Sequence, residues 1–234
     1  LTDLYYLYLK NCKIGDYSKL ENNWNLQYLY LYLPPSMEMD DANDQIKNLG
    51  LGLENASNLK KLEHFGISGE TKFFENTDSD FSFTSDHYNR FYNFDQSKLG
   101  FTSVNRSKLT TIENLENINE VIRKKVKYLV LSCNNISSIS SLSGYPNIAE
   151  LEISCNSNLK NLNGLNNHEK LEILVAHRCG LESISDLAGT TLLNLLTLQD
   201  NTNLSSLNGL ANSTKLKKLI AFNCNFTDVS ALDG

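Results

Sequence analysis

Residue types that commonly carry catalysis are few in this chain and are widely separated. Histidine occurs at four distant positions, His64, His87, His168 and His177. None is accompanied by a nucleophile and a third orienting group of the kind an acyl-transfer triad needs. Gly50-Leu51-Gly52 lacks the lysine and the following helix pattern of a phosphate-binding loop. We therefore predict no enzymatic activity, no catalytic residues and no bound cofactor.

Metal binding is the second chemistry that the residues suggest. The irregular middle of the chain holds acidic and amide side chains at Glu75, Asn76, Asp78, Asp80 and Asp86. Alternating carboxylates can bind calcium, but the glycine and terminal glutamate of an EF-hand loop are absent. There is also no Cys-x-x-Cys pair for zinc. We interpret this stretch as a solvated loop and predict no metal site.

The strongest pattern is a repeat of apolar residues. Five segments share the pattern L-x-x-L-x-L-x-x-N/C-x-L with conservative replacements, at steps of 22, 23, 22 and 23 residues; they open at Val126, Ile148, Leu171, Leu193 and Leu216. A fixed period of this size with this consensus is that of a leucine-rich repeat. Units two apart are offset by 45 residues, which indicates a duplicated pair of repeats.

The same pattern begins at Leu4 and again at Leu26, and two irregular insertions then interrupt it, at about 34–58 and 69–98. The first insertion is acidic and is a candidate for a short helix. Leu99, Leu109, Ile112 and Leu115 suggest a degenerate unit before the regular repeats over 126–234. We predict one leucine-rich repeat domain over 1–234, a solenoid of the α/β class. Its parallel β-sheet should line the concave face, with mostly 3₁₀ or extended turns on the convex face.

The cysteines follow the repeat. Cys12, Cys179 and Cys224 occupy the Asn position, where a buried thiol can bond a loop. Cys133 and Cys155 precede the Asn of adjacent units and should be stacked neighbours. Two interpretations remain open: a disulfide in an oxidising compartment, or thiols in the cytosol.

Composition limits the classes of partner. The net charge of −6 and the pI of about 5.3 argue against nucleic acid. No apolar run approaches the roughly 20 residues that a membrane-spanning helix needs. The chain begins at Leu1 and stops inside a repeat, so we expect it to be a piece of a longer protein. The short basic run of Arg123, Lys124, Lys125 and Lys127 is interpreted as a solvated face rather than an anion site.

The regular half resembles the internalin-type leucine-rich repeats of bacterial surface proteins. The resemblance lies in the turn segments 135–142, 181–187 and 226–232, which read NISSISSL, LESISDL and FTDVSAL. It implies non-catalytic protein binding through the concave sheet, often to a host surface protein, in a protein at the cell surface or outside the cell. Intracellular phosphatase-regulator proteins share nearly the same repeat, so a cytoplasmic scaffold is the alternative.

The side chains between the strand leucines should face outward on the concave face. In the first two units they are tyrosines, and Tyr8 should lie beside Tyr30 and Tyr6 beside Tyr28; further along they are mainly aliphatic. Aromatic side chains are enriched in binding hot spots, whereas an aromatic ladder that only stabilises strand pairing is the alternative. The predicted partner-binding residues are Tyr6, Tyr8, Tyr28, Tyr30, Tyr32, Tyr128, Val130, Val175, Ile220 and Phe222.

Overall fold

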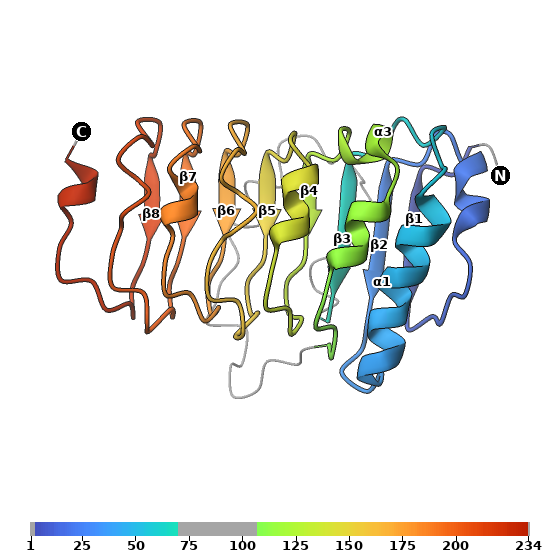
Figure 1. The fold of residues 1–234 in the computed structure, drawn as a ribbon, viewed down its shortest axis with the longest axis horizontal. Coiled ribbons are helices and arrows are strands. Elements are labelled where there is room, and N and C mark those ends of the chain that lie inside the picture. Colours follow the sequence, from blue (N-terminus) through green and yellow to red (C-terminus); the bar gives the residue numbers. More distant parts are fainter. Residues whose placement is uncertain (1–2, 70–106, 234) are drawn as a thin grey trace, which may run out of the picture.

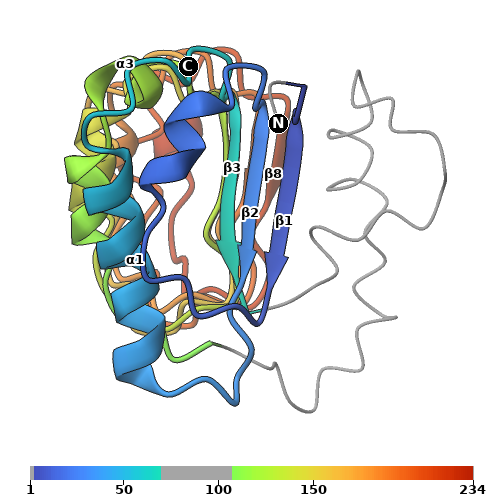
Figure 2. The ribbon, with the colours of Figure 1, turned by 90° about the vertical axis from the view of Figure 1, so that its right-hand side faces the viewer.

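The protein is described here by a computed structural model covering residues 3–69 and 107–233. Eight strands form one parallel sheet in chain order (Figure 1). They are β1 Tyr6–Lys10, β2 Tyr28–Tyr32, β3 His64–Ser68, β4 Tyr128–Val130, β5 Glu150–Glu152, β6 Ile173–Val175, β7 Leu195–Thr197 and β8 Lys218–Ile220. Helices and turns cover one side of this sheet (Figure 2). The predicted leucine-rich repeat solenoid is confirmed.

Alternation along each strand separates two faces. The strand leucines point toward the helical side and join one continuous hydrophobic cluster, whose fully buried members extend from Tyr17 to Leu210. Leu151, Leu174 and Leu196 occupy the same inward position in successive strands. Each buried leucine contributes about 1.5–3 kcal/mol, and every coil shares its leucines with its neighbours. Stability therefore comes from stacking rather than from any single repeat.

The Asn position closes each coil onto the preceding one. The Asn156 amide donates to the carbonyls of Leu131 and Ile153 at 2.9 and 2.7 Å, and its Oδ1 accepts from the Ile136 N–H at 3.3 Å. Where the position is Cys179, the thiol donates to the Ile153 carbonyl at 3.3 Å. Buried backbone groups left unpaired are costly, so this column holds the turns in place. The predicted buried, loop-bonding thiol is confirmed at Cys179. Cys12 and Cys224 also donate to backbone carbonyls, but both are only half-buried.

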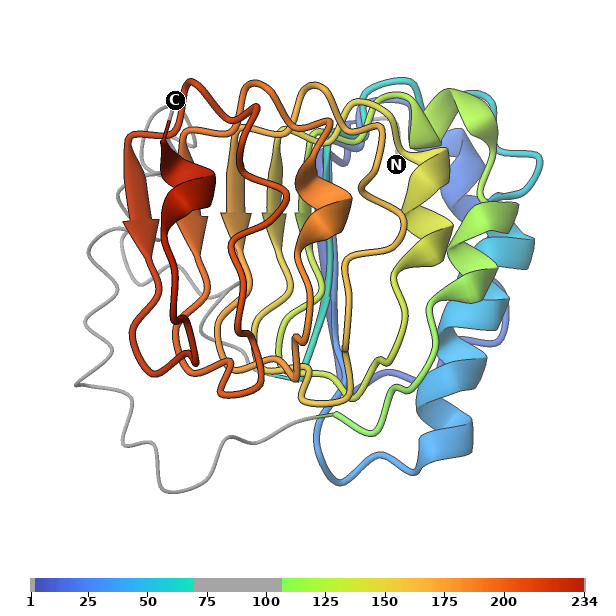
Figure 3. The same cartoon turned by 60° about the vertical axis from the view of Figure 1, so that its left-hand side comes forward.

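The convex turns alternate in type along the regular repeats. Three 3₁₀ segments, η5 Ser140–Gly144, η6 Ser185–Leu187 and η7 Ser230–Leu232, begin 45 residues apart. The two repeats between them have open turns with a glycine at positive φ, Gly164 at 117° and Gly209 at 114° (Figure 3). A Cβ at Gly164 would lie 2.4 Å from the Ile139 carbonyl oxygen, and one at Gly209 would lie 2.3 Å from that of Ile184. The duplicated pair inferred from the sequence therefore consists of two repeats whose convex turns differ in type.

The first predicted insertion contains a longer helix than expected. Helix α1 spans Met39–Leu53 and replaces the convex turn of the second repeat. It begins inside the acidic stretch because Asp40 and Asp41 in its first turn complement the helix dipole. A Cβ at Gly50 would lie 2.2 Å from the Asn114 carbonyl oxygen, so the absence of a side chain there lets α1 approach the 3₁₀ turn η4 Glu113–Asn117.

The second interruption splits one repeat instead of separating two. Strand β3 pairs directly with β4, with Phe65 opposite Leu129. Beyond the strand, the N–H groups of Gly69 and Ser107 both donate to the Cys133 carbonyl, at 3.2 and 2.9 Å. The predicted degenerate unit is therefore wrong as a separate repeat: Leu109, Ile112 and Leu115 complete the coil that β3 begins. Leu99 and most of the predicted 69–98 insertion lie outside the described residues.

Two short elements complete the convex side. The 3₁₀ turn η1 Ser18–Asn22 belongs to the first coil, and helix α3 Glu120–Arg123 follows η4. The η1, η5 and η7 turns, like η6, open with a side chain that accepts the N–H two residues later, as Ser138 does from Ser140 at 3.2 Å. Such local bonds favour a turn over a longer helix, which explains the mostly 3₁₀ and extended character predicted for this side.

Candidate protein-binding face

The outward side chains of the sheet form ordered rows on its concave face. Tyr6 lies opposite Tyr28 and Tyr8 opposite Tyr30, the register predicted from the sequence. The first row continues through the remaining strands as His64, Tyr128, Glu150, Ile173, Leu195 and Lys218, and the second as Gly66, Val130, Glu152, Val175, Thr197 and Ile220. The face therefore changes from aromatic at the N-terminal end, through acidic, to aliphatic.

An aromatic ladder crosses the first four strands. The His64 ring stacks between Tyr28 and Tyr128, with centroids 4.2 Å away on both sides. The Tyr6 ring lies 5.9 Å from that of Tyr28. His64 escaped the sequence prediction, although aligning Leu62, Phe65 and Ile67 with the repeat places it in the tyrosine row. Stacking of this kind stabilises strand pairing and also holds the ring edges and hydroxyls in fixed positions.

Outward and inward side chains belong to separate clusters. Tyr28 and Tyr30, with Tyr6, Tyr8 and Val130 packed against them, form one outward cluster. Ile173, Val175 and Leu195 form a second. Neither shares members with the leucine core. The predicted binding residues are thus not turned inward beneath the leucines.

The predicted residues differ in exposure. Phe222 is 52% exposed, whereas Tyr28, Tyr30 and Val175 are buried at 9, 6 and 5%. Tyr28 packs against its ladder neighbours and also against Tyr5, in an edge-to-face contact with ring centroids 6.1 Å apart. The other predicted residues are partly exposed, namely Tyr6, Tyr8, Tyr32, Tyr128, Val130 and Ile220. The sequence pattern did not indicate that three of the predicted residues would be buried.

Charged groups on and beside this face have perturbed acidities. Burial, together with repulsion from Glu172, raises the pKa of Glu150 to about 7, and burial raises the pKa of Glu152 to about 8. Burial lowers the pKa of His177 to about 4. At the rim, Arg178 Nε donates to the Asp200 carboxylate at 3.1 Å, and Asn223 donates to its other oxygen at 2.8 Å.

Other sequence candidates do not converge on a site. All five cysteines lie within the described residues, and Cys133 and Cys155 are both buried; the choice between a disulfide and two thiols stays a prediction. The basic run is divided among separate partners: Lys124 pairs with Glu120 and Lys127 with Glu63. His168 is buried in a turn and faces away from the sheet row. His87 and the calcium candidates Glu75, Asn76, Asp78, Asp80 and Asp86 lie outside the described residues.

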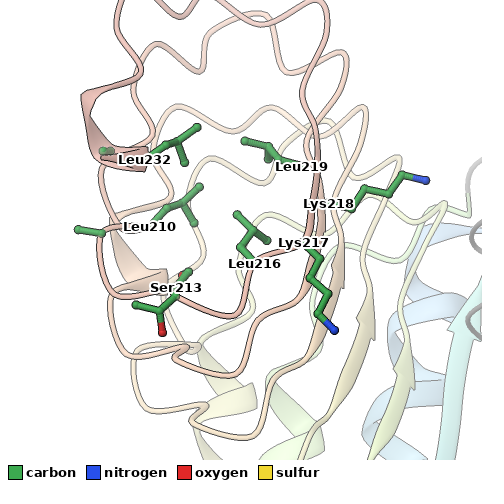
Figure 4. Close-up of a pocket in the computed structure, with 10 residues that line it drawn as sticks. Leu210, Ser213, Leu216, Lys217, Lys218, Leu219 and Leu232 are labelled. Carbon is green, nitrogen blue, oxygen red and sulfur yellow. The ribbon is translucent and has the colours of Figure 1, made fainter. Parts of the chain in front are cut away.

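A cavity lies at the C-terminal end of the repeats. It has a volume of about 280 Å³ and lies beside β8, where Leu210, Leu216, Leu219 and Leu232 point into it (Figure 4); it is the open side of the repeat core at the last coil. In the part of the chain that the structure describes, no three His, Cys, Asp or Glu residues are placed to hold a metal ion. The same part contains no helix of the length and apolarity needed to traverse a bilayer.

Comparison with known proteins identifies the fold. No family model matches the chain, and no curated protein matches it by sequence. Among solved structures, internalin C2 of Listeria monocytogenes is 21% identical, with a TM-score of 0.52 over 93% of this chain and 80% of that protein. An internalin InlF of the same organism is 18% identical, with a TM-score of 0.41 over 94% of this chain and 68% of that one. InlJ is 14% identical, with a TM-score of 0.43 over 97% and 65%. The chain therefore has the leucine-rich repeat fold seen in internalin C2.

Proposed function

We propose that this chain is a non-catalytic protein–protein interaction module that binds a partner protein through the concave face. The observation that carries the proposal is the separation of the outward clusters from the leucine core. Side chains that the fold does not need for its core are held in fixed rows by strand pairing. Such pre-ordering reduces the entropy lost on association. Tyrosine edges and aliphatic groups provide the contact area typical of hot spots.

The contact surface proposed is the set of predicted residues, with different roles. Partly exposed and exposed members would touch the partner directly, and they occur at both ends of the face, as Tyr8 and Phe222 do. The buried Tyr28, Tyr30 and Val175 would support them from within the ladder and the aliphatic cluster. The exposed Glu172 and the partly exposed Glu150 would add charge selectivity.

The protein to which the module belongs is proposed to act at a bacterial surface or after secretion, with a host protein as the partner class. The internalin-like turns and the fold shared with internalin C2 support this. An intracellular scaffold of the phosphatase-regulator type is the second candidate.

The test compares matched charge substitutions on the two sides of the solenoid. Phe222 on the concave face is 52% exposed and Leu192 on a connecting turn is 43% exposed. Proteins captured by the wild-type chain from host surface extracts are re-tested against Phe222→Asp and Leu192→Asp, with thermal unfolding as the folding control. We expect Phe222→Asp to weaken binding at least about tenfold, or 1.4 kcal/mol, and Leu192→Asp to leave it unchanged. Equal binding by both variants, or selective loss with Leu192→Asp, contradicts the proposed face.

A further inference from the structure

One column of residues lies just beyond the ends of strands β4 to β8. Steps of 22, 23, 22 and 23 residues from Cys133 lead to Cys155, Arg178, Asp200 and Asn223. All five have a positive φ, between 54° and 62°. Outside glycine, this left-handed conformation is most common for asparagine and aspartate, and it is unfavourable for most other L-residues. Cysteine at two successive positions of the column therefore needs a reason other than backbone preference.

The backbone holds the members of this column in the same way in each coil. The Cys133 N–H donates to the Ser154 carbonyl of the next coil at 2.8 Å, and the Cys155 N–H makes the corresponding bond at 2.9 Å. The Arg178 N–H likewise donates to the Gln199 carbonyl at 2.9 Å. Because conformation and hydrogen bonding are the same, the Cα–Cβ bonds start in the same direction in every coil. What the C-terminal members of the column do, the two cysteines can also do.

The polar members of the column contact each other from coil to coil. Arg178 Nε donates to the Asp200 carboxylate at 3.1 Å, and Asn223 donates to its other oxygen at 2.8 Å. Neighbouring strands lie about 4.7–4.9 Å apart, and the Cα atoms of disulfide-bonded cysteines lie about 4.4–6.8 Å apart. Cys133 and Cys155 continue the register in which β4 faces β5. Their separation is therefore that of neighbouring strands, within the range of a disulfide.

The position of Cys133 gives a bond there a structural consequence. Its carbonyl accepts the N–H groups of both Gly69 and Ser107, at 3.2 and 2.9 Å, so the two halves of the split coil meet on it. These halves are far apart in sequence, and closing a longer loop costs more conformational entropy. Cys133 and Cys155 are both 3% exposed. A disulfide formed while the coils are open would be enclosed by the folded chain, where a reducing thiol has little access.

We propose that Cys133 and Cys155 form a disulfide that joins the coil of β4 to the coil of β5 during folding. The oxidant is a disulfide, either oxidised glutathione or that of a thiol–disulfide oxidoreductase. One cysteine thiolate attacks it and forms a mixed disulfide, and the second thiolate then displaces the remaining thiol of the oxidant. The two electrons and two protons of the cysteines pass to the oxidant, which leaves as two thiols. The bond persists in an oxidising compartment, and the inference does not depend on the proposed function.

Counting thiols tests the inference, because the chain has five cysteines. The wild-type chain is unfolded in urea and refolded with reduced and oxidised glutathione, with circular dichroism to confirm refolding. It is then denatured again and alkylated with N-ethylmaleimide, and its intact mass gives the number of reactive thiols. We expect three of the five to react, and proteolytic fragments that contain Cys133 and Cys155 to be joined. The urea midpoint should be about 1 M higher before reduction than after it.

Two variants make the pairing specific. Cys155→Ser should leave all four remaining thiols reactive, with a urea midpoint that does not respond to reductant. The matched control Cys12→Ser changes a half-buried cysteine of the first coil and should leave two of four thiols reactive. Five reactive thiols in the refolded wild type, a link between other cysteines, four reactive thiols in Cys12→Ser, or a wild-type midpoint that reduction does not change overturns the inference.

Discussion

Replacing Asn156 by alanine should destabilise the protein more than any surface change in the same coil. The substitution removes one donor from each of the carbonyls of Leu131 and Ile153, which keep the Asn134 amide and the Cys179 thiol as their other donors. It leaves the Ile136 N–H without its side-chain acceptor. All of these groups are buried. At about 1–3 kcal/mol for the orphaned N–H and about 0.5–1.5 kcal/mol for each hydrogen bond lost from a carbonyl that keeps a second donor, with incomplete additivity, the expected loss is about 2–4 kcal/mol. That is a large part of a typical domain stability of about 5–15 kcal/mol.

Two further variants make the explanation specific. Asn156→Cys introduces the residue that the next coil already uses, where the Cys179 thiol keeps a bond to the Ile153 carbonyl; it should recover about half of the loss. Asn158→Ala removes an amide whose bond to Asn135 is exposed and should change stability by less than about 0.5 kcal/mol.

Urea unfolding followed by circular dichroism measures these changes, and amide hydrogen exchange locates them. We expect protection to fall first in the coils around β4 and β5. A loss below about 1 kcal/mol for Asn156→Ala, or a cysteine variant as unstable as the alanine variant, would refute the explanation based on buried backbone groups.

Three other predictions concern packing, pH and one hydroxyl. Gly50→Ala should cost about 1–3 kcal/mol because its Cβ would meet the Asn114 carbonyl, whereas Gly15→Ala, with nothing within 4 Å, should be nearly neutral; urea midpoints decide. Glu152 has a folded pKa of about 8 against an ordinary 4.5, so the folded state keeps a proton that the unfolded chain releases, and stability should fall as pH rises from 4.5 to 8. The slope is at most about 1.4 kcal/mol per pH unit, and unfolding at several pH values should show it reduced in Glu152→Gln. Tyr145→Phe removes a buried hydroxyl bond of 2.7 Å to the Leu115 carbonyl and should lower stability by about 1–2 kcal/mol in the same assay.

The regular repeats could be predicted from the sequence almost residue by residue. In β4 to β8 the leucine spacing is uninterrupted, so the outward rows follow from counting, as with Tyr128, Val130 and Val175. The tyrosine register of β1 and β2 followed for the same reason. Leucines and tyrosines alternate along these strands, and this period of two predicts a strand with one face in the core. Packing of the leucines in the core favours the same arrangement.

The remaining features depend on contacts that the repeat pattern does not encode. Helix α1 is longer than predicted for two reasons. The acidic side chains of its first turn interact favourably with the helix dipole. The helix also packs against neighbouring coils, where Gln45 accepts the Ile14 N–H at 2.8 Å. The sequence pattern predicted two separate units where the structure has the single coil begun by β3, because the two halves of this coil are far apart in sequence. The burial of Tyr28 and Val175 could not be predicted either, because the repeat pattern fixes which way a side chain points and not what packs over it.

The alternation of unlike turns makes two coils, not one, the unit by which such a scaffold can be lengthened or shortened. Gly164 and Gly209 each sit under a carbonyl supplied by the 3₁₀-bearing coil before them. Excising 22 or 23 residues would bring two turns of the same type together and lose this fit. Excising 45 residues restores the original neighbour at the splice. Gene rearrangements, and engineers who wish to change the length of the concave surface, are therefore restricted to even steps.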